Sequence, residues 1–139
     1  MVAIRPAQAS DLSAISALDE RLTGLSKPTY WQDMLVPERH FLVAETDRGA
    51  LAGFIAGEIR AWEFGQPAAG WVFAIQVDPR TRLKGVGTAL FEALAARFRE
   101  AGVTRLRTLV DRKDHLILSF FRAQGMVAGP SLQLDMELP

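Results

Sequence analysis

The chain has 139 residues, of which 49% are apolar, and its 16 basic residues balance its 16 acidic ones. A chain of this length and composition is most simply one domain, residues 1–139, with enough apolar side chains to bury a core. Balanced charge argues against general nucleic-acid binding, which relies on an excess of positive charge. The sequence contains no cysteine, which excludes disulfides, thiolate metal sites and a covalent thioester on an enzyme cysteine.

The N-terminal residues lack the apolar core of a signal peptide. The longest uncharged runs, such as residues 49–57, fall well short of the roughly 20 apolar residues that a membrane span needs. We therefore expect a cytoplasmic protein with no membrane partner.

The first half of the chain is predicted to begin with a short β-branched strand that Pro6 ends. Ser10 or Asp11 can then cap a helix whose apolar residues recur every three or four positions and which stops at Gly24. A second, weaker helix and two strands joined by a turn at Gly49 are expected next. These elements are expected at residues 2–5, 11–22, 30–35, 41–45 and 51–60.

The second half is predicted to begin with a strand that is apolar at nearly every position, as in a central strand buried on both faces. An amphipathic helix with apolar side chains four residues apart follows and ends near Gly102. A strand, a short apolar helix and an alternating final strand complete the chain. We expect the strands at residues 71–77, 106–110 and 132–138 and the helices from 86 and at 116–123.

These elements give the order β-α-α-β-β-β-α-β-α-β, which predicts a mixed α/β architecture (α+β, with a mixed sheet). The glycines Gly49, Gly53 and Gly57 recur every four residues from the predicted turn into the strand that follows it. We interpret them as easing a twisted or bulged strand, because glycine within a strand commonly marks such sites.

A basic, glycine-bearing turn follows the apolar strand and leads into the amphipathic helix. Backbone N–H groups at a helix N-terminus bind anions, and Gly85 and Gly87 let a large anion approach the main chain. Arg82 and Lys84 add positive charge. An ATP or GTP loop would need a Gly-Lys-Ser/Thr sequence, and the third glycine of a dinucleotide loop would fall on Leu90. Both alternatives therefore fail.

The turn Arg82-Leu-Lys-Gly85-Val-Gly87 matches the pattern Arg/Gln-x-x-Gly-x-Gly/Ala at a strand-to-helix junction. With Val77-Asp-Pro79 before it and Ser119-Phe-Phe-Arg-Ala-Gln-Gly125-Met after it, the chain resembles the GNAT superfamily of acyl-CoA-dependent N-acetyltransferases. The resemblance implies the GNAT fold. It also implies direct transfer of an acetyl group from acetyl-CoA to a primary amine in a ternary complex.

The resemblance further implies where acetyl-CoA binds. Amides of the turn would hold the pyrophosphate of coenzyme A, and the main chain of the preceding strand would pair with the pantetheine. Asp114 stands where an Asn commonly meets the cofactor. The implied cofactor-binding residues are Ile75, Val77, Arg82, Leu83, Lys84, Gly85, Val86, Gly87, Thr88, Asp114 and Phe121.

The two usual proton-transfer residues of the family are replaced. Phe73 stands where a Glu base is often found, and Phe120-Phe121 replaces the Phe-Tyr pair whose Tyr is the usual general acid. Glu58 is a candidate base, against the simpler reading of a solvated strand position. Tyr30 is a candidate acid or acceptor contact, and packing explains it equally well.

The two histidines, His40 and His115, are read as surface or capping residues rather than bases. No candidate ligands show metal-binding spacing, so we predict no metal.

The acceptor amine is left open: a small metabolite, an antibiotic, a peptide N-terminus or a lysine. Four aromatic residues suggest that it has an apolar part: Tyr30, Trp31, Trp62 and Phe64. The alternative function is an acyl-CoA-binding module that has lost transferase activity and acts as a sensor or regulator. A nucleotide-binding protein is a more remote alternative. A homodimer is compatible with the resemblance.

Overall fold

The computed structural model of the chain describes residues 1–61, 64–81 and 83–139. The chain forms two compact units, Met1–Leu109 and Val110–Pro139. Among the described residues, no helix combines the length and the apolar character that crossing a membrane requires.

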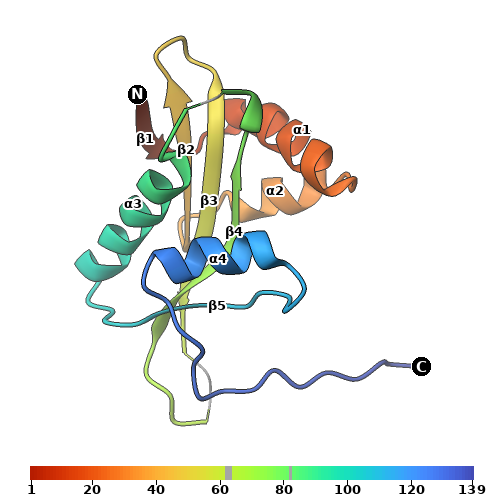
Figure 1. Cartoon of the computed structure of the whole chain (residues 1–139), viewed down its shortest axis with the longest axis vertical. Coiled ribbons are helices and arrows are strands. Elements are labelled where there is room, and N and C mark those ends of the chain that lie inside the picture. The colour runs from red at the N-terminus through yellow and green to blue at the C-terminus, as the bar shows by residue number, and fades with distance from the viewer. Residues whose placement is uncertain (62–63, 82) are drawn as a thin grey trace. The chain divides into compact units, whose positions relative to one another are not determined.

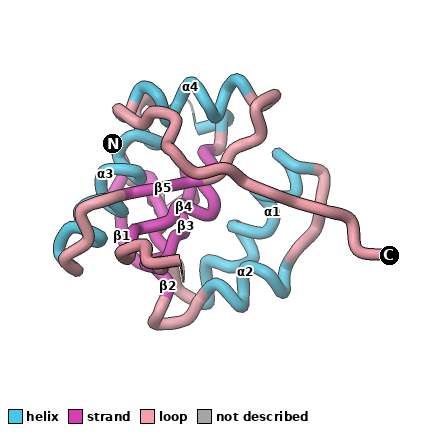
Figure 2. The backbone as a smooth tube through the Cα atoms, turned by 90° about the horizontal axis from the view of Figure 1, so that it is seen from below, coloured by secondary structure: helices cyan, strands magenta, loops and turns pink. Residues whose placement is uncertain are grey.

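The first unit is built on a five-stranded mixed sheet with the strand order β1-β2-β3-β4-β5. Neighbouring strands are antiparallel except β4 and β5, which are parallel and are connected through α3. The sheet separates α1 and α2 from α3 (Figures 1 and 2). The strands are β1 Val2–Pro6, β2 Arg39–Thr46, β3 Leu51–Arg60, β4 Ala69–Val77 and β5 Leu106–Thr108. The helices are α1 Leu12–Thr23, α2 Pro28–Met34 and α3 Val86–Glu100.

The start of α1 differs from the prediction that a Ser10 or Asp11 side chain caps it. Asp11 is the N-cap residue, but its carboxylate makes no cap hydrogen bond to α1. Instead it accepts bonds from the Arg5 guanidinium and from the Gln8 N–H, at 2.7 to 2.9 Å. These bonds with Arg5 lower the pKa of Asp11. The predicted end of the helix is confirmed, because Gly24 is the C-cap with φ 77°.

An aromatic core fills the space between the sheet and the pair α1–α2. Trp31 is 1% exposed and lies edge-on to Phe54, with ring centroids 4.9 Å apart. Met34 is also buried. Their burial fixes α2 against the sheet, although this helix has only seven residues.

On the other face of the sheet, glycines make room for α3. A Cβ atom added at Gly70 or Gly57 would overlap Phe98 or press against it, and at Gly53 it would crowd Leu90. The strand register shifts between Ala56 and Gly57. The predicted role of glycine at a bulge is therefore confirmed at Gly57, and close packing of α3 is a second role.

The second unit contains α4, His115–Ala123, which is followed by Gly125 with φ 99°. The final strand predicted at residues 132–138 does not form: these residues have no regular secondary structure, and Figure 2 draws them as loop. Their alternation satisfies the side-chain pattern of a strand. A strand also needs a neighbour to pair its backbone groups, and no described strand provides one.

Candidate functional site

One edge of β4 is open at the end that leads toward α3. The parallel partner β5 pairs only with Gly70, Trp71 and Val72. Beyond Val72 the main chain of β4, including Ile75 and Val77, has no described strand on that side. Unpaired strand groups can pair with an extended ligand as an added strand would.

Phe73 lies where the two halves of β4 change register. Ala56 pairs with Ala74 and the next residue, Gly57, pairs with Val72, so Phe73 is the extra residue of a β-bulge. Its side chain is 39% exposed. The prediction of a strand buried on both faces is therefore wrong here, because Phe73 is exposed and residues 74–77 are only half-buried.

Asp78 directly follows β4 and organises the turn that leads to α3. Its carboxylate is buried and accepts hydrogen bonds from Arg21 Nη2 at 3.1 Å and from Arg80 Nη2 at 3.2 Å. It also accepts one from the Arg80 backbone N–H at 2.9 Å. Burial raises the pKa of Asp78, but the hydrogen bonds with Arg80 outweigh it, so the net pKa is lowered. The turn is thus held by an ionised carboxylate.

The turn delivers the chain to the N-terminus of α3 through Gly85. Gly85 is the N-cap with φ 76°, and a Cβ atom built there would meet nothing within 4 Å. The first intrahelical bond joins the Ala89 N–H to the Gly85 carbonyl, so the Val86 and Gly87 N–H groups precede the helical ladder. Lys84 is exposed and Leu83 is half-buried. Arg82, another predicted ligand, lies outside the described residues, as does Trp62.

These features fit an anion carried by an extended ligand. The open edge of β4 runs into the turn, and the turn runs into a helix N-terminus with space at Gly85. Ile75, Val77, Leu83, Lys84, Gly85, Val86, Gly87 and Thr88 all lie along this path in the first unit.

Asp114 and Phe121 lie in the second unit. The Asp114 carboxylate accepts the Ile117 N–H at 3.1 Å and so caps α4. Phe121 is buried, with its ring centroid 5.4 Å from that of Phe120.

The candidate base Glu58 lies on the opposite sheet face from Gly57. Its Oε2 is 3.3 Å from Arg39 Nε, and the two side chains are 23% and 35% exposed. The Glu58 carboxylate is therefore ion-paired with Arg39. This is compatible with the simpler reading of Glu58 as a solvated strand residue.

The candidate acid Tyr30 is 42% exposed and lies edge-on to Trp31. Partial burial raises the pKa of Tyr30, with a smaller contribution from Asp19, while Arg39 opposes both. The phenol therefore keeps its proton at neutral pH.

The histidines behave differently from each other. His115 is exposed at the start of α4, as predicted for a surface residue. His40 is half-buried, with its ring 5.2 Å from that of Phe98, so reading it as a surface or capping residue is wrong. Burial lowers the pKa of His40, and the nearby Arg97 lowers it further.

Asp19 is a charged residue that the sequence reasoning missed. It is 1% exposed, and its carboxylate accepts hydrogen bonds from Gln76 Nε2 at 2.7 Å and from Trp31 Nε1 at 3.2 Å. Lys27 Nζ lies 3.4 Å from the same carboxylate. The sequence does contain one signal of its burial, because Asp19 comes directly after Leu18 in the apolar stripe of the helix.

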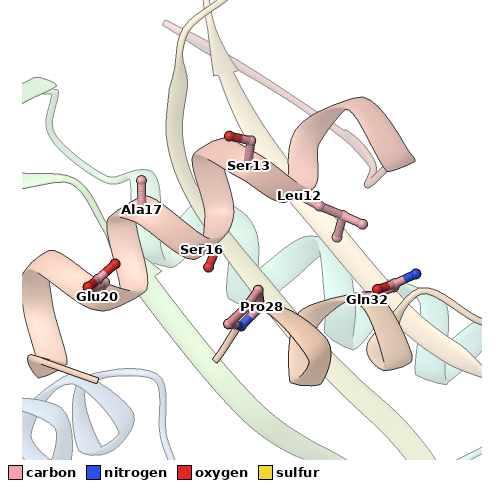
Figure 3. Close-up of a pocket in the computed structure, with 7 residues that line it drawn as sticks. All are labelled: Leu12, Ser13, Ser16, Ala17, Glu20, Pro28 and Gln32. Carbon is pink, nitrogen blue, oxygen red and sulfur yellow. The ribbon is translucent and has the colours of Figure 1, made fainter. Parts of the chain in front are cut away.

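A groove of about 390 Å³ lies between α1 and α2, with lining side chains from both helices (Figure 3). None of its lining residues is among the predicted site residues. They are Leu12, Ser13, Ser16, Ala17, Glu20, Pro28 and Gln32. Within residues 1–61, 64–81 and 83–139, no group of three His, Asp or Glu side chains could hold a metal ion.

A sequence model of the Acetyltransferase (GNAT) family matches residues 8–126. L-2,4-diaminobutyric acid acetyltransferase of Nocardia farcinica (strain IFM 10152) is 33% identical over 91 residues, which are 66% of this chain and 45% of that protein. The chain thus spans less than half the length of this curated relative.

Solved structures share the fold. Aminoglycoside antibiotic 6'-N-acetyltransferase AAC(6')-Ih from Acinetobacter baumannii aligns over 100% of both chains with a TM-score of 0.82 and 19% identity. AAC(6')-Iy, in complex with the bisubstrate analog CoA-S-monomethyl-acetylneamine, aligns over 100% of this chain and 99% of its own with a TM-score of 0.83 and 18% identity.

Proposed function

The chain belongs to the GNAT acetyltransferase family, and on that premise we propose that it moves an acetyl group from acetyl-CoA to a primary amine by direct transfer. The observation that carries the proposal is the continuous path from the open edge of β4 through Gly85 to the N-terminus of α3. The family match runs across both compact units, which supports one acetyltransferase domain over residues 1–139.

We assign the binding of acetyl-CoA to main-chain groups. The peptide groups of Ile75 and Val77 would pair with the two amides of the pantetheine arm. The N–H groups from Leu83 to Thr88 would surround the pyrophosphate, and Lys84 would add charge. We also propose a contact from Arg82.

The chemistry requires few groups from the protein. The thioester supplies an activated acetyl group, the amine nitrogen forms a bond to its carbonyl carbon, and the carbon–sulfur bond breaks. The attacking amine loses a proton and the thiolate gains one. We propose Tyr30, which keeps its proton at neutral pH, as a donor, and Glu58 as an acceptor through water.

The relatives support a proposal for the class of acceptor. The names of the relatives reported above refer to acetylation of diaminobutyric acid and of aminoglycosides, which are small amines. We propose a small amine acceptor for this chain too. The aromatic residues Tyr30 and Phe64 would contact its apolar part, whereas Trp31, also predicted for this role, is 1% exposed and packs in the core.

The test measures thiol release from acetyl-CoA with a panel of amines, beside calorimetric binding of coenzyme A. Turnover on at least one amine and binding of coenzyme A are the expected results. Tight binding without turnover on any amine would favour the acyl-CoA-binding sensor. Binding of ATP or NAD that excludes coenzyme A would overturn the proposal.

We also propose a homodimer. Four apolar side chains alternate along the C-terminal segment and are 78% to 87% exposed: Leu132, Leu134, Met136 and Leu138. Exposed apolar patches often mark protein–protein interaction sites, and these four side chains share one short segment.

A further inference from the structure

Three donor groups lie close to the buried carboxylate of Asp19. Gln76 Nε2 and Trp31 Nε1 donate to its two oxygens, and Lys27 Nζ supplies the positive charge. A carboxylate that is 1% exposed needs such a cation, because an unpaired buried charge is strongly unfavourable.

The Lys27 ammonium lies beside two aromatic rings as well as beside Asp19. Its Nζ lies 5.4 Å from the Tyr30 ring centroid and 5.5 Å from that of Trp31. One carboxylate and two aromatic faces around an ammonium form a common arrangement for recognising cationic ligands. We call Asp19, Tyr30 and Trp31 the Asp19 box. Lys27, which lies against it, is 39% exposed, so its departure would open the box to solvent on that side.

Gln76 connects the Asp19 box to β4. It stands between Ile75 and Val77, the strand residues assigned to the pantetheine. Its Nε2 donates to Asp19, so its Oε1 must face away from that carboxylate. Among the described residues, Oε1 is the one buried side-chain polar atom without a hydrogen-bond partner. Oε1 therefore calls for an N–H donor on the side of Gln76 that faces away from Asp19.

We propose that the Asp19 box is a binding site for a primary ammonium group of the acceptor, and that Lys27 occupies it while the acceptor is away. The Lys27 side chain is then a tethered competitor that leaves when the acceptor binds. This inference rests on the proposed function, because it names the class of acceptor for that reaction.

The ammonium in the box is not the one that reacts. A carboxylate in contact with an ammonium favours the charged form, and a charged ammonium has no lone pair with which to attack a thioester. The reacting nitrogen must therefore be a second amine of the same molecule. The preferred acceptors are small diamines and polyamines rather than monoamines.

The first experiment needs no acetyl-CoA. Lys27→Ala removes the tethered cation, and butylammonium is added while the melting temperature is recorded. The variant should melt below the wild type and regain stability saturably with butylammonium. Neutral 1-butanol should not restore it. The double variant Lys27→Ala/Asp19→Asn should show no saturable response.

A stability loss that butylammonium does not reverse would overturn the site and leave a purely structural ion pair. If Lys27→Ala does not fold, the wild type is titrated with 1,4-diaminobutane while the Trp31 indole N–H is followed by NMR, assigned with Trp31→Phe. A saturable shift supports the box, and an unchanged signal refutes it.

The second experiment compares acetylation of 1,4-diaminobutane and 1-butylamine. Lys27→Ala should lower the KM for the diamine severalfold and leave the KM for the monoamine unchanged. Rescue by butylammonium without any turnover would keep the site and reject the transferase function. Turnover without rescue, and with equal KM changes for both amines, would keep the function and reject the site.

Discussion

Arg21 Nη2, on α1, lies 3.1 Å from Oδ2 of Asp78, the first residue after β4. Two residues earlier in each segment, Asp19 accepts a hydrogen bond from Gln76 at 2.7 Å. Two polar contacts thus join the same stretch of α1 to the end of β4. Side-chain hydrogen bonds therefore link the helix beside the proposed acceptor site to the turn proposed for the pyrophosphate.

Asp78→Asn should destabilise the protein by about 1–3 kcal/mol, because it removes a buried charged acceptor from two guanidinium groups and leaves their donors poorly paired. Urea unfolding at pH 7 measures the change. The control is Asp47→Asn in the exposed β2–β3 turn, which removes the same charge at the surface. Equal losses in both variants would contradict the anchoring role of Asp78.

Gly85→Glu should abolish binding of coenzyme A, because it puts bulk and negative charge at the proposed pyrophosphate position. Gly49→Glu is a matched control: the two glycines have φ values of 76° and 78°, so each glutamate bears a similar backbone strain of about 1–2 kcal/mol. Calorimetry with coenzyme A should detect binding to the Gly49 variant only. Unchanged affinity in the Gly85 variant would refute the assignment of the turn.

Gly70→Ala should cost about 1–3 kcal/mol, since the added methyl group overlaps the Phe98 ring and must push α3 from the sheet. Gly129→Ala is the control, because a Cβ atom there meets nothing within 4 Å. Thermal unfolding of both variants measures the difference. A Gly70 variant as stable as the control would show that α3 can shift freely on the sheet.

His40 should make stability depend on pH below neutrality. Its pKa in the folded state is lowered by burial and by Arg97, so the folded protein binds a proton less readily than the unfolded chain. The free energy of unfolding is thus unaffected by His40 above the unfolded-state pKa of about 6.5. It declines as the pH falls from that value to the lower pKa of the folded state. The His40 titration is followed by NMR in folded and urea-unfolded protein. A folded midpoint at or above the unfolded one would contradict the expectation.

Local patterns in the sequence were sufficient for most elements of the fold. The four-residue spacing of Val86, Leu90, Leu94 and Phe98 predicted the buried face of α3, and all four are buried. The limits of β5 and the state of residues 132–138 depend on which strands pair, and pairing partners are not encoded in a local pattern. Asp19 was missed for the same reason, since its three partners come from α2, β4 and the segment between α1 and α2.

The exposed C-terminal segment provides the test of the homodimer. Leu134→Asp with Met136→Asp places charge on the apolar side of the segment, and should convert a particle of two chains into one of a single chain. Gln133→Asp adds a charge at the position before Leu134. In an extended strand this side chain would point to the opposite side, so the dimer should stay intact. Light scattering after size exclusion measures the mass. A wild type that has the mass of one chain over the whole concentration range would reject the dimer.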